Sequence, residues 1–148
     1  QTLVWAARSA LHLEGDLVEC GVFTGLSAGT IADTLRFGQV SKSFYLYDTF
    51  DGLAPEYSSD AELARTEGEY AVLPEIYPNL VKCFSAYRNV HIVKGIVPDV
   101  LHEKSPDKVA FLHLDLNAAQ AEIGALEVLF DDFGHIRGNV FMLCRGLN

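Results

Sequence analysis

The chain has 148 residues, which is enough for one domain with a buried core, over residues 1–148. Hydrophobic residues make up 49% of it and aromatic residues 11%, and this composition excludes a disordered chain. The net charge of −9 excludes nucleic acid as an expected partner, because a phosphate backbone would repel the protein.

The cysteines and the apolar segments bear on where the protein works. The chain has an odd number of cysteines, and their spacing is not that of metal ligands: Cys20, Cys83 and Cys144. This predicts free thiols in a reducing compartment. No apolar run approaches the roughly 20 residues of a membrane span, and no signal peptide is visible. We therefore expect a cytoplasmic protein with no membrane partner. The chain begins at Gln1, which indicates a fragment or a processed chain.

In chain order, the first four predicted elements alternate between helix and strand. Apolar spacing predicts a helix over residues 2–13, a strand over 17–22, a helix over 26–37 and an aromatic strand over 43–47. Residues 51–69 then break the pattern with six acidic residues, and we expect a surface loop with a short helix at 61–65. Loops of this length are usually functional. The loop could fold over a bound cofactor, or it could simply be exposed to solvent, and the sequence leaves both alternatives open.

The second half continues the alternation. Pro78 is expected to open a helix, followed by a strand over 90–94, a short helix over 97–103 and a strand over 109–114. A helix is predicted over 122–133, with a buried stripe of Ile123, Leu126, Leu129, Phe130 and Phe133. Gly134 and Gly138 lead into a fifth strand over 140–143. The pattern predicts an α/β, Rossmann-like, doubly wound and mostly parallel sheet with helices on both faces.

Residues 16–29 predict a nucleoside site at the carboxyl ends of these strands. A buried strand leads into a turn that spans Gly21 to Gly25 and then into a helix, and the next strand ends on Asp48. Glycines let a backbone approach a ligand, and an acid after the second strand can bind a ribose diol. The turn is G-x-x-x-G, not the G-x-G-x-x-G that packs a pyrophosphate. This favours S-adenosylmethionine over a dinucleotide.

Three blocks at strand ends resemble the macrocin O-methyltransferase family. They are Val18-Glu-Cys-Gly-Val22, Leu46-Tyr-Asp-Thr-Phe-Asp-Gly-Leu53 and Phe111-Leu-His-Leu-Asp115, in this order. Members of that family are class I S-adenosylmethionine enzymes that methylate sugar hydroxyls. The resemblance runs from about Gly15 to the end of the chain. It implies a small hydroxylated acceptor and a catalytic core that is truncated after the fifth strand.

The resemblance also implies roles for individual residues. Glu19 would take the ammonium end of the cofactor, partly through water, and Gly21 and Gly25 would admit its methionine portion. Ser27 would face its carboxylate, at a helix N-terminus. Asp48 and its neighbour Thr49 would lie at the ribose, and Gly95 and Ile96 at the adenine. Asp115 matches the family's first metal-ligand aspartate, which implies magnesium.

Two departures from the family pattern weaken the expected catalysis. Asn117 stands where better-known members carry a second aspartate, the presumed base, and Cys144-Arg145 replaces an acidic pair. Asp131-Asp132 imitates that pair, but periodicity places it in the last helical turn, away from the pocket. We therefore expect the 148-residue chain to bind cofactor better than it methylates.

Several residues have a second interpretation. His113 could accept the proton in place of the missing aspartate, or it could be a hydrogen-bonded core histidine. Asp115 could also cap the helix that follows it. Cys20 is expected to be a small buried side chain, not a nucleophile.

The leading hypothesis for function is an S-adenosylmethionine-dependent O-methyltransferase acting on a small hydroxylated molecule such as a sugar. The alternative is a cofactor-binding but catalytically silent fragment or partner subunit. A nucleotide-dependent oxidoreductase is disfavoured by the glycine pattern. A sheet that lacks its final strands would expose an unpaired edge, which leaves a homo-oligomer open.

Overall fold

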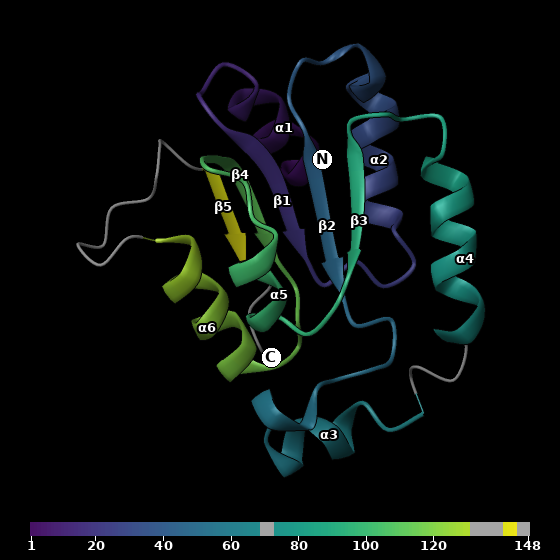
Figure 1. Cartoon of the computed structure of the whole chain (residues 1–148), viewed down its shortest axis with the longest axis vertical. Helices are drawn as coiled ribbons and strands as arrows, with labels where there is room; N and C mark the ends of the chain where they lie inside the picture. The colour runs from purple at the N-terminus through teal and green to yellow at the C-terminus, as the bar shows by residue number, and fades with distance from the viewer. Residues whose placement is uncertain (69–72, 131–140, 145–148) are drawn as a thin grey trace.

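A five-stranded parallel sheet forms the centre of the molecule (Figure 1). The computed structural model describes residues 1–68, 73–130 and 141–144. The strand order is β3-β2-β1-β4-β5, and each neighbouring pair is parallel. The strands are β1 Asp16–Cys20, β2 Phe44–Asp48, β3 Val90–Lys94, β4 Val109–Leu114 and β5 Phe141–Cys144. The predicted α/β, Rossmann-like doubly wound class is confirmed.

Helices cover both faces of this sheet (Figure 1). Three of them share one hydrophobic cluster on one face: α1 Thr2–Ala10, α2 Leu26–Thr34 and α4 Leu73–Phe84. Two others share a second cluster on the opposite face: α5 Asp99–Glu103 and α6 Ala119–Leu129. Short 3₁₀ turns lie at η1 Phe37–Gln39 and η2 Pro55–Tyr57.

Strand β1 places a charged side chain, that of Glu19, in the interior of a sheet that is covered on both faces. Leu17 packs in the α1/α2/α4 cluster, whereas Val18 and Cys20 pack in the α5/α6 cluster. Side chains alternate between the faces of a strand, so Glu19 lies on the same face as Leu17. Its side chain is completely buried there.

The acidic segment after β2 lies beyond the carboxyl ends of the strands. It contains η2 and a short helix, α3 Asp60–Arg65, which Figure 1 shows below the strand arrowheads. The expected helix at 61–65 is confirmed within one residue. The segment therefore occupies the edge at which ligands of such sheets bind.

The predictions for α1 and α2 ran three residues too far, and the prediction for α4 was wrong in where the helix starts. Pro78 lies inside α4 and does not open it, because the helix starts at Leu73. Ile76, Leu80 and Phe84 are buried at successive helical turns. Packing of this stripe on the sheet outweighs the usual cost of an interior proline.

Helix α6 starts at Ala119 and ends at Leu129, whereas the prediction ran from 122 to 133. Its buried residues are Ala121, Ala125 and Leu129, and Ile123 is 48% exposed. Small residues face inward because α5 lies close: a Cβ on Gly124 would lie 2.7 Å from a side-chain carbon of Pro98. Phe130 is already extended, and Asp131, Asp132, Phe133, Gly134 and Gly138 lie outside the described residues.

Gly21 allows the turn after β1 to lie very close to the backbone at the end of β4. Its φ is +89°, and a Cβ added there would lie 2.1 Å from the backbone oxygen of Asp115. By contrast, a Cβ on Gly29, within α2, would meet nothing within 4 Å. The two glycines therefore make a matched pair for substitution.

We expect Gly21→Ala to lower the free energy of unfolding by about 3 kcal/mol or more, because backbone atoms would have to separate. Gly29→Ala should raise it by about 0.5–1 kcal/mol, because alanine favours a helix. Urea unfolding of both variants measures the difference. Equal stability of the two variants would contradict the close contact at Gly21.

Candidate functional site

The carboxyl ends of four neighbouring strands carry the predicted site residues, and the backbone joins these ends in sequence. The N–H of Gly95 donates to the carbonyl of Asp48 at 3.0 Å, and that of Gly21 donates to the carbonyl of Tyr47 at 2.9 Å. On the other side, the N–H of Asp115 donates to the carbonyl of Cys20 at 2.9 Å. The structure therefore brings the ends of β3, β2, β1 and β4 to one edge, as the sequence predicted.

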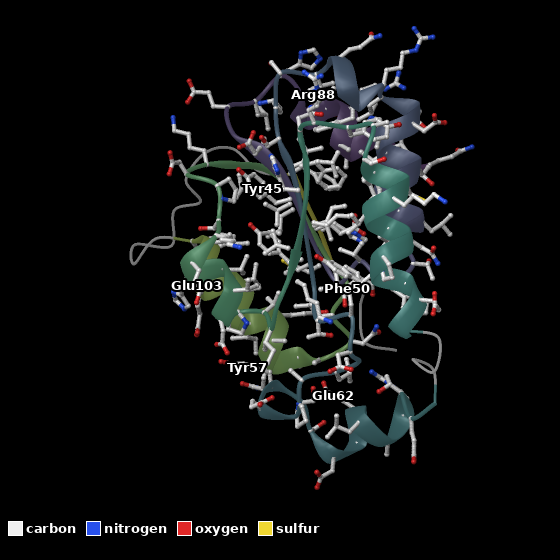
Figure 2. All side chains as sticks on the ribbon, turned by 45° about the vertical axis from the view of Figure 1, so that its right-hand side comes forward. Tyr45, Phe50, Tyr57, Glu62, Arg88 and Glu103 are labelled. Carbon is white, nitrogen blue, oxygen red and sulfur yellow. The ribbon has the colours of Figure 1, made fainter. Side chains whose placement is uncertain are left out.

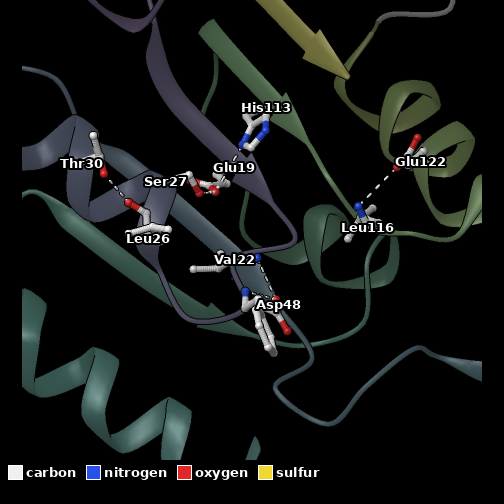
Figure 3. Close-up of polar contacts among 10 residues, drawn as sticks. Glu19, Val22, Leu26, Ser27, Thr30, Asp48, His113, Leu116 and Glu122 are labelled. Carbon is white, nitrogen blue, oxygen red and sulfur yellow. Dashed lines mark hydrogen bonds and ion pairs between the residues drawn. The ribbon is translucent and has the colours of Figure 1, made fainter. Parts of the chain in front are cut away.

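The Asp48 carboxylate fastens two loops of this edge together (Figure 3). Its Oδ2 accepts hydrogen bonds from the backbone N–H of Val22 at 2.7 Å and of Phe23 at 2.9 Å. Its Oδ1 accepts one from Phe50 at 2.7 Å. Phe23 and Phe50 both have positive φ, +46° and +49°, which is strained for a non-glycine residue. Asp48 therefore holds two strained turns in place.

Glu19, Ser27 and His113 form a buried polar cluster beside the glycine turn (Figure 3). The Ser27 hydroxyl donates to Oε1 of Glu19. His113 lies opposite Glu19 in the β1–β4 register, and its Nδ1 is 3.2 Å from the same oxygen. The pair is within ion-pair distance, but it is not aligned as a hydrogen bond. Among the described residues, neither Oε2 of Glu19 nor Nδ1 of His113 has a hydrogen-bond partner.

Other predicted cofactor residues have protein partners in the structure. The Thr49 hydroxyl donates to the carbonyl of Gly52 at 2.6 Å, within its own loop. Gly25 has φ +75° as the N-cap of α2, and a Cβ there would overlap Leu80. A Cβ on Gly95 would likewise lie too close to the side chain of Val100, at 2.8 Å. The next residue, Ile96, is half-buried. The two glycines therefore allow close packing of α4 and α5 on this edge.

Asp115 is half-buried at the end of β4. It does not cap α6, because the N-cap is Ala118, which has no side-chain cap, and that alternative was wrong. In the described part of the chain, no three His, Cys, Asp or Glu side chains are grouped so that they could hold a metal ion. The described residues therefore give no support to the magnesium site expected at Asp115.

Glu62 caps α6 from another segment, and the sequence analysis missed it. Its Oε2 accepts from the N–H and the hydroxyl of Ser59, both at 2.7 Å, while its Oε1 accepts from the N–H of Ala119 at 2.9 Å. Figure 2 shows Glu62 on α3, beyond the end of the sheet. The S-x-x-E pattern of residues 59–62 is a visible capping-box signal. Nothing in it indicates the second contact, which spans 57 residues of chain.

The loop between β4 and α6 is held by further polar contacts. Arg65 Nη2 donates to the carbonyl of Asn117, at 3.4 Å, and Asn117 has φ +58°. The N–H of Leu116 donates to Glu122 at 3.3 Å. Burial raises the pKa of the Glu122 carboxyl, the Leu116 bond opposes this, and the charges of Asp115 and Glu62 add to the rise. The acidic segment is therefore attached to the site loop by at least two side chains.

Cys20 is a buried core residue, as expected. Burial raises the pKa of its thiol, and the neighbouring Glu19 charge raises it further. The thiolate that a nucleophile requires is therefore disfavoured. No helix in the described ranges has both the length and the apolar character that crossing a bilayer requires.

The strand order and the glycine turn define a Rossmann-like α/β fold. Residues 6–139 match the model of the macrocin-O-methyltransferase (TylF) family, and the chain belongs to this family.

The solved structures that share the fold include two methyltransferases. The O-methyltransferase NovP superposes with a TM-score of 0.69 at 19% identity, over 86% of this chain and 57% of that one. The calicheamicin methyltransferase CalS11 gives a TM-score of 0.58 at 24% identity, over 86% of this chain and 56% of that one. The chain thus spans a little over half the length of these enzymes. No curated protein matches its sequence.

We expect Asp48→Ala to lower the free energy of unfolding by about 2–3 kcal/mol, because three backbone N–H groups lose a charged acceptor. Asp51→Ala is the matched control, since the Asp51 side chain is exposed in the same loop. Urea unfolding compares the two variants. A similar decrease in the free energy of unfolding of both variants would show that the Asp48 carboxylate does not hold the two loops together.

Glu62→Ala should lower the free energy of unfolding by about 1 kcal/mol, the usual cost of a lost helix cap. Hydrogen exchange at the Ala119 amide should become faster, whereas Glu67→Ala, an exposed change in the same segment, should leave it unchanged. The bonds from Ala119 and Ser59 lower the pKa of Glu62. Its contribution is therefore fully present above the ordinary carboxyl pKa and is lost as the pH falls through the lowered value. Unaltered exchange at Ala119 in Glu62→Ala would contradict the cap.

Proposed function

We propose that this chain is the cofactor-binding core of an S-adenosylmethionine-dependent O-methyltransferase acting on a hydroxyl of a small molecule, with a sugar as the leading candidate. One observation carries the proposal: beside the glycine turn of a chain that belongs to a methyltransferase family lies a buried carboxylate, and no described residue bonds to one of its oxygens. A buried, unpaired carboxylate oxygen is costly and favours a cationic or donating partner. The ammonium group of S-adenosylmethionine supplies such a partner.

The burial of Glu19 decides how that contact would be made. Its side chain has no exposed surface, so Oε2 would reach the ammonium through a bridging water or after a small displacement of the turn. Ser27 is half-buried at the start of α2 and already donates to Glu19. Because its only hydroxyl proton is used in that bond, the N-terminal amides of α2 would bind the cofactor's carboxylate.

Asp48 is proposed to bind the ribose through the lone pair of its carboxylate that the backbone leaves free. A carboxylate offers about four lone-pair positions, and the backbone uses three of them. The same bonds that fix the turn would thus orient the carboxylate for a ribose hydroxyl. Gly95 and Ile96 lie next to Asp48 along the edge and would border the adenine.

When bound, the cofactor supplies an electrophilic methyl group on a sulfonium. The protein must then orient the acceptor hydroxyl in line with that methyl group and take its proton. Asp115 is proposed for the proton, since it is a half-buried carboxylate next to the glycine turn. The burial of His113 beside Glu19 supports a role in holding Glu19 more than a role as the base. Asn117 carries no carboxylate, so slow transfer remains our expectation.

Membership of an enzyme family disfavours the alternative of a catalytically silent partner. The two hypotheses differ in one measurement. Transfer of a radiolabelled methyl group from S-adenosylmethionine to a panel of hydroxylated small molecules supports the enzyme, and ligand binding without any transfer supports the silent partner.

Calorimetric titration with S-adenosylhomocysteine tests the cofactor. We expect binding by the unmodified chain, and weaker binding by roughly 1.5–3 kcal/mol in Glu19→Gln, because a charged hydrogen bond is lost. Glu67→Gln, an exposed change of the same type, should bind normally. Tighter binding of NAD than of S-adenosylhomocysteine, or no binding of the latter, would overturn the proposed function.

A further inference from the structure

In the described part of the chain, two buried side-chain atoms have no hydrogen-bond partner, and they belong to neighbouring residues on β1 and β4. Glu19 is 0% exposed and His113 is 9% exposed, and the unpartnered atoms are Oε2 of the first and Nδ1 of the second. Most buried polar atoms in proteins have partners, so two adjacent exceptions require an explanation. A purely structural Glu–His pair would be expected to align its own hydrogen bond.

The arrangement is asymmetric about the Glu19 carboxylate. Ser27, from α2, and His113, from β4, both approach Oε1, and Figure 3 shows them on either side of it. No described group bonds to Oε2. The Ser27 hydrogen bond and the close approach of His113 Nδ1, 3.2 Å away, both lie at Oε1, fix the plane of the carboxylate and leave Oε2 as its open acceptor. The cluster is therefore organised to receive one donating group.

We propose that His113 is a positioning residue for ligand specificity: it orients Glu19 so that Oε2 recognises the amino group of an amino-acid-bearing nucleoside. The inference rests on the proposed function, since that function supplies the ligand. His113 acts through Glu19 and does not itself touch the reacting atoms. Its contribution is confined to the amino-acid end of the ligand, because Asp48, Gly95 and Ile96 lie at the ends of other strands, β2 and β3.

Two probes separate this role from a general effect on folding. S-Adenosylhomocysteine carries the amino acid, whereas 5′-methylthioadenosine keeps the adenosine and the thioether but lacks the amino acid. His113→Leu removes the ring nitrogen that lies 3.2 Å from Glu19, and His113→Asn places an N–H near the position of Nδ1. His102→Leu changes an exposed histidine on α5 and serves as the matched control.

Calorimetry on the full chain should show that His113→Leu raises the Kd for S-adenosylhomocysteine about tenfold or more. The Kd for 5′-methylthioadenosine should stay within about twofold, since the nucleoside contacts remain. His113→Asn should recover most of the lost affinity, and His102→Leu should bind both probes normally. In a Glu19→Gln background, His113→Leu should cause little further loss, because both residues act on one contact.

Equal weakening of both probes by His113→Leu would overturn the proposal, since His113 would then only support the fold. Unchanged binding of both probes by that variant would overturn it as well. If the unmodified chain binds neither probe, the proposed function itself fails. If the unmodified chain binds 5′-methylthioadenosine as tightly as S-adenosylhomocysteine, the amino group is not recognised. This result would overturn the inference about His113 and leave the proposed binding of the nucleoside standing.

Discussion

The carboxylate of Asp48 is the constraint on which the carboxyl edge of the sheet depends. It accepts three backbone hydrogen bonds, two from the turn after β1 and one from the loop after β2. Both loops contain a phenylalanine with positive φ, a conformation that persists only where surrounding contacts impose it. Because the turn and the loop are fixed to one side chain, their relative position is set before any ligand arrives. Such preorganisation lowers the entropic cost of binding.

The fold and the candidate site compete for the same polar groups. Gly21 and Gly25 were expected to make room for a ligand, yet they make room for a backbone carbonyl and for a leucine. Thr49 bonds within its own loop, and Ser27 bonds to Glu19. Among the described residues, Oε2 of Glu19 and Nδ1 of His113 remain without a hydrogen-bond partner. Residues that build the edge thus leave very little polar capacity unused, and this restricts which ligand chemistry the edge can accept.

Local sequence signals predicted the sheet well because the strands are short, apolar and bounded by turn residues. Strands β3 and β4 begin and end where they were expected. The errors arose where tertiary packing decides. Pro78 is tolerated inside α4 because Ile76, Leu80 and Phe84 bury one stripe. The bulky pattern of α6 was misleading because the close approach of α5 selects small residues. For the site, strand ends could be predicted, but the partners of each carboxylate could not.

Glu62 shows why such partners are hidden from sequence analysis. Its spacing from Ser59 gives a complete local explanation, so no unexplained signal remains in the sequence. Only the folded chain brings the N-terminus of α6, which has no side-chain cap of its own, to the second carboxylate oxygen. One carboxylate then serves two helix N-termini, a geometry favoured by both helix dipoles. It also joins the acidic segment to the loop that carries Asp115. A change in this segment can therefore reach the candidate site without contact with any ligand.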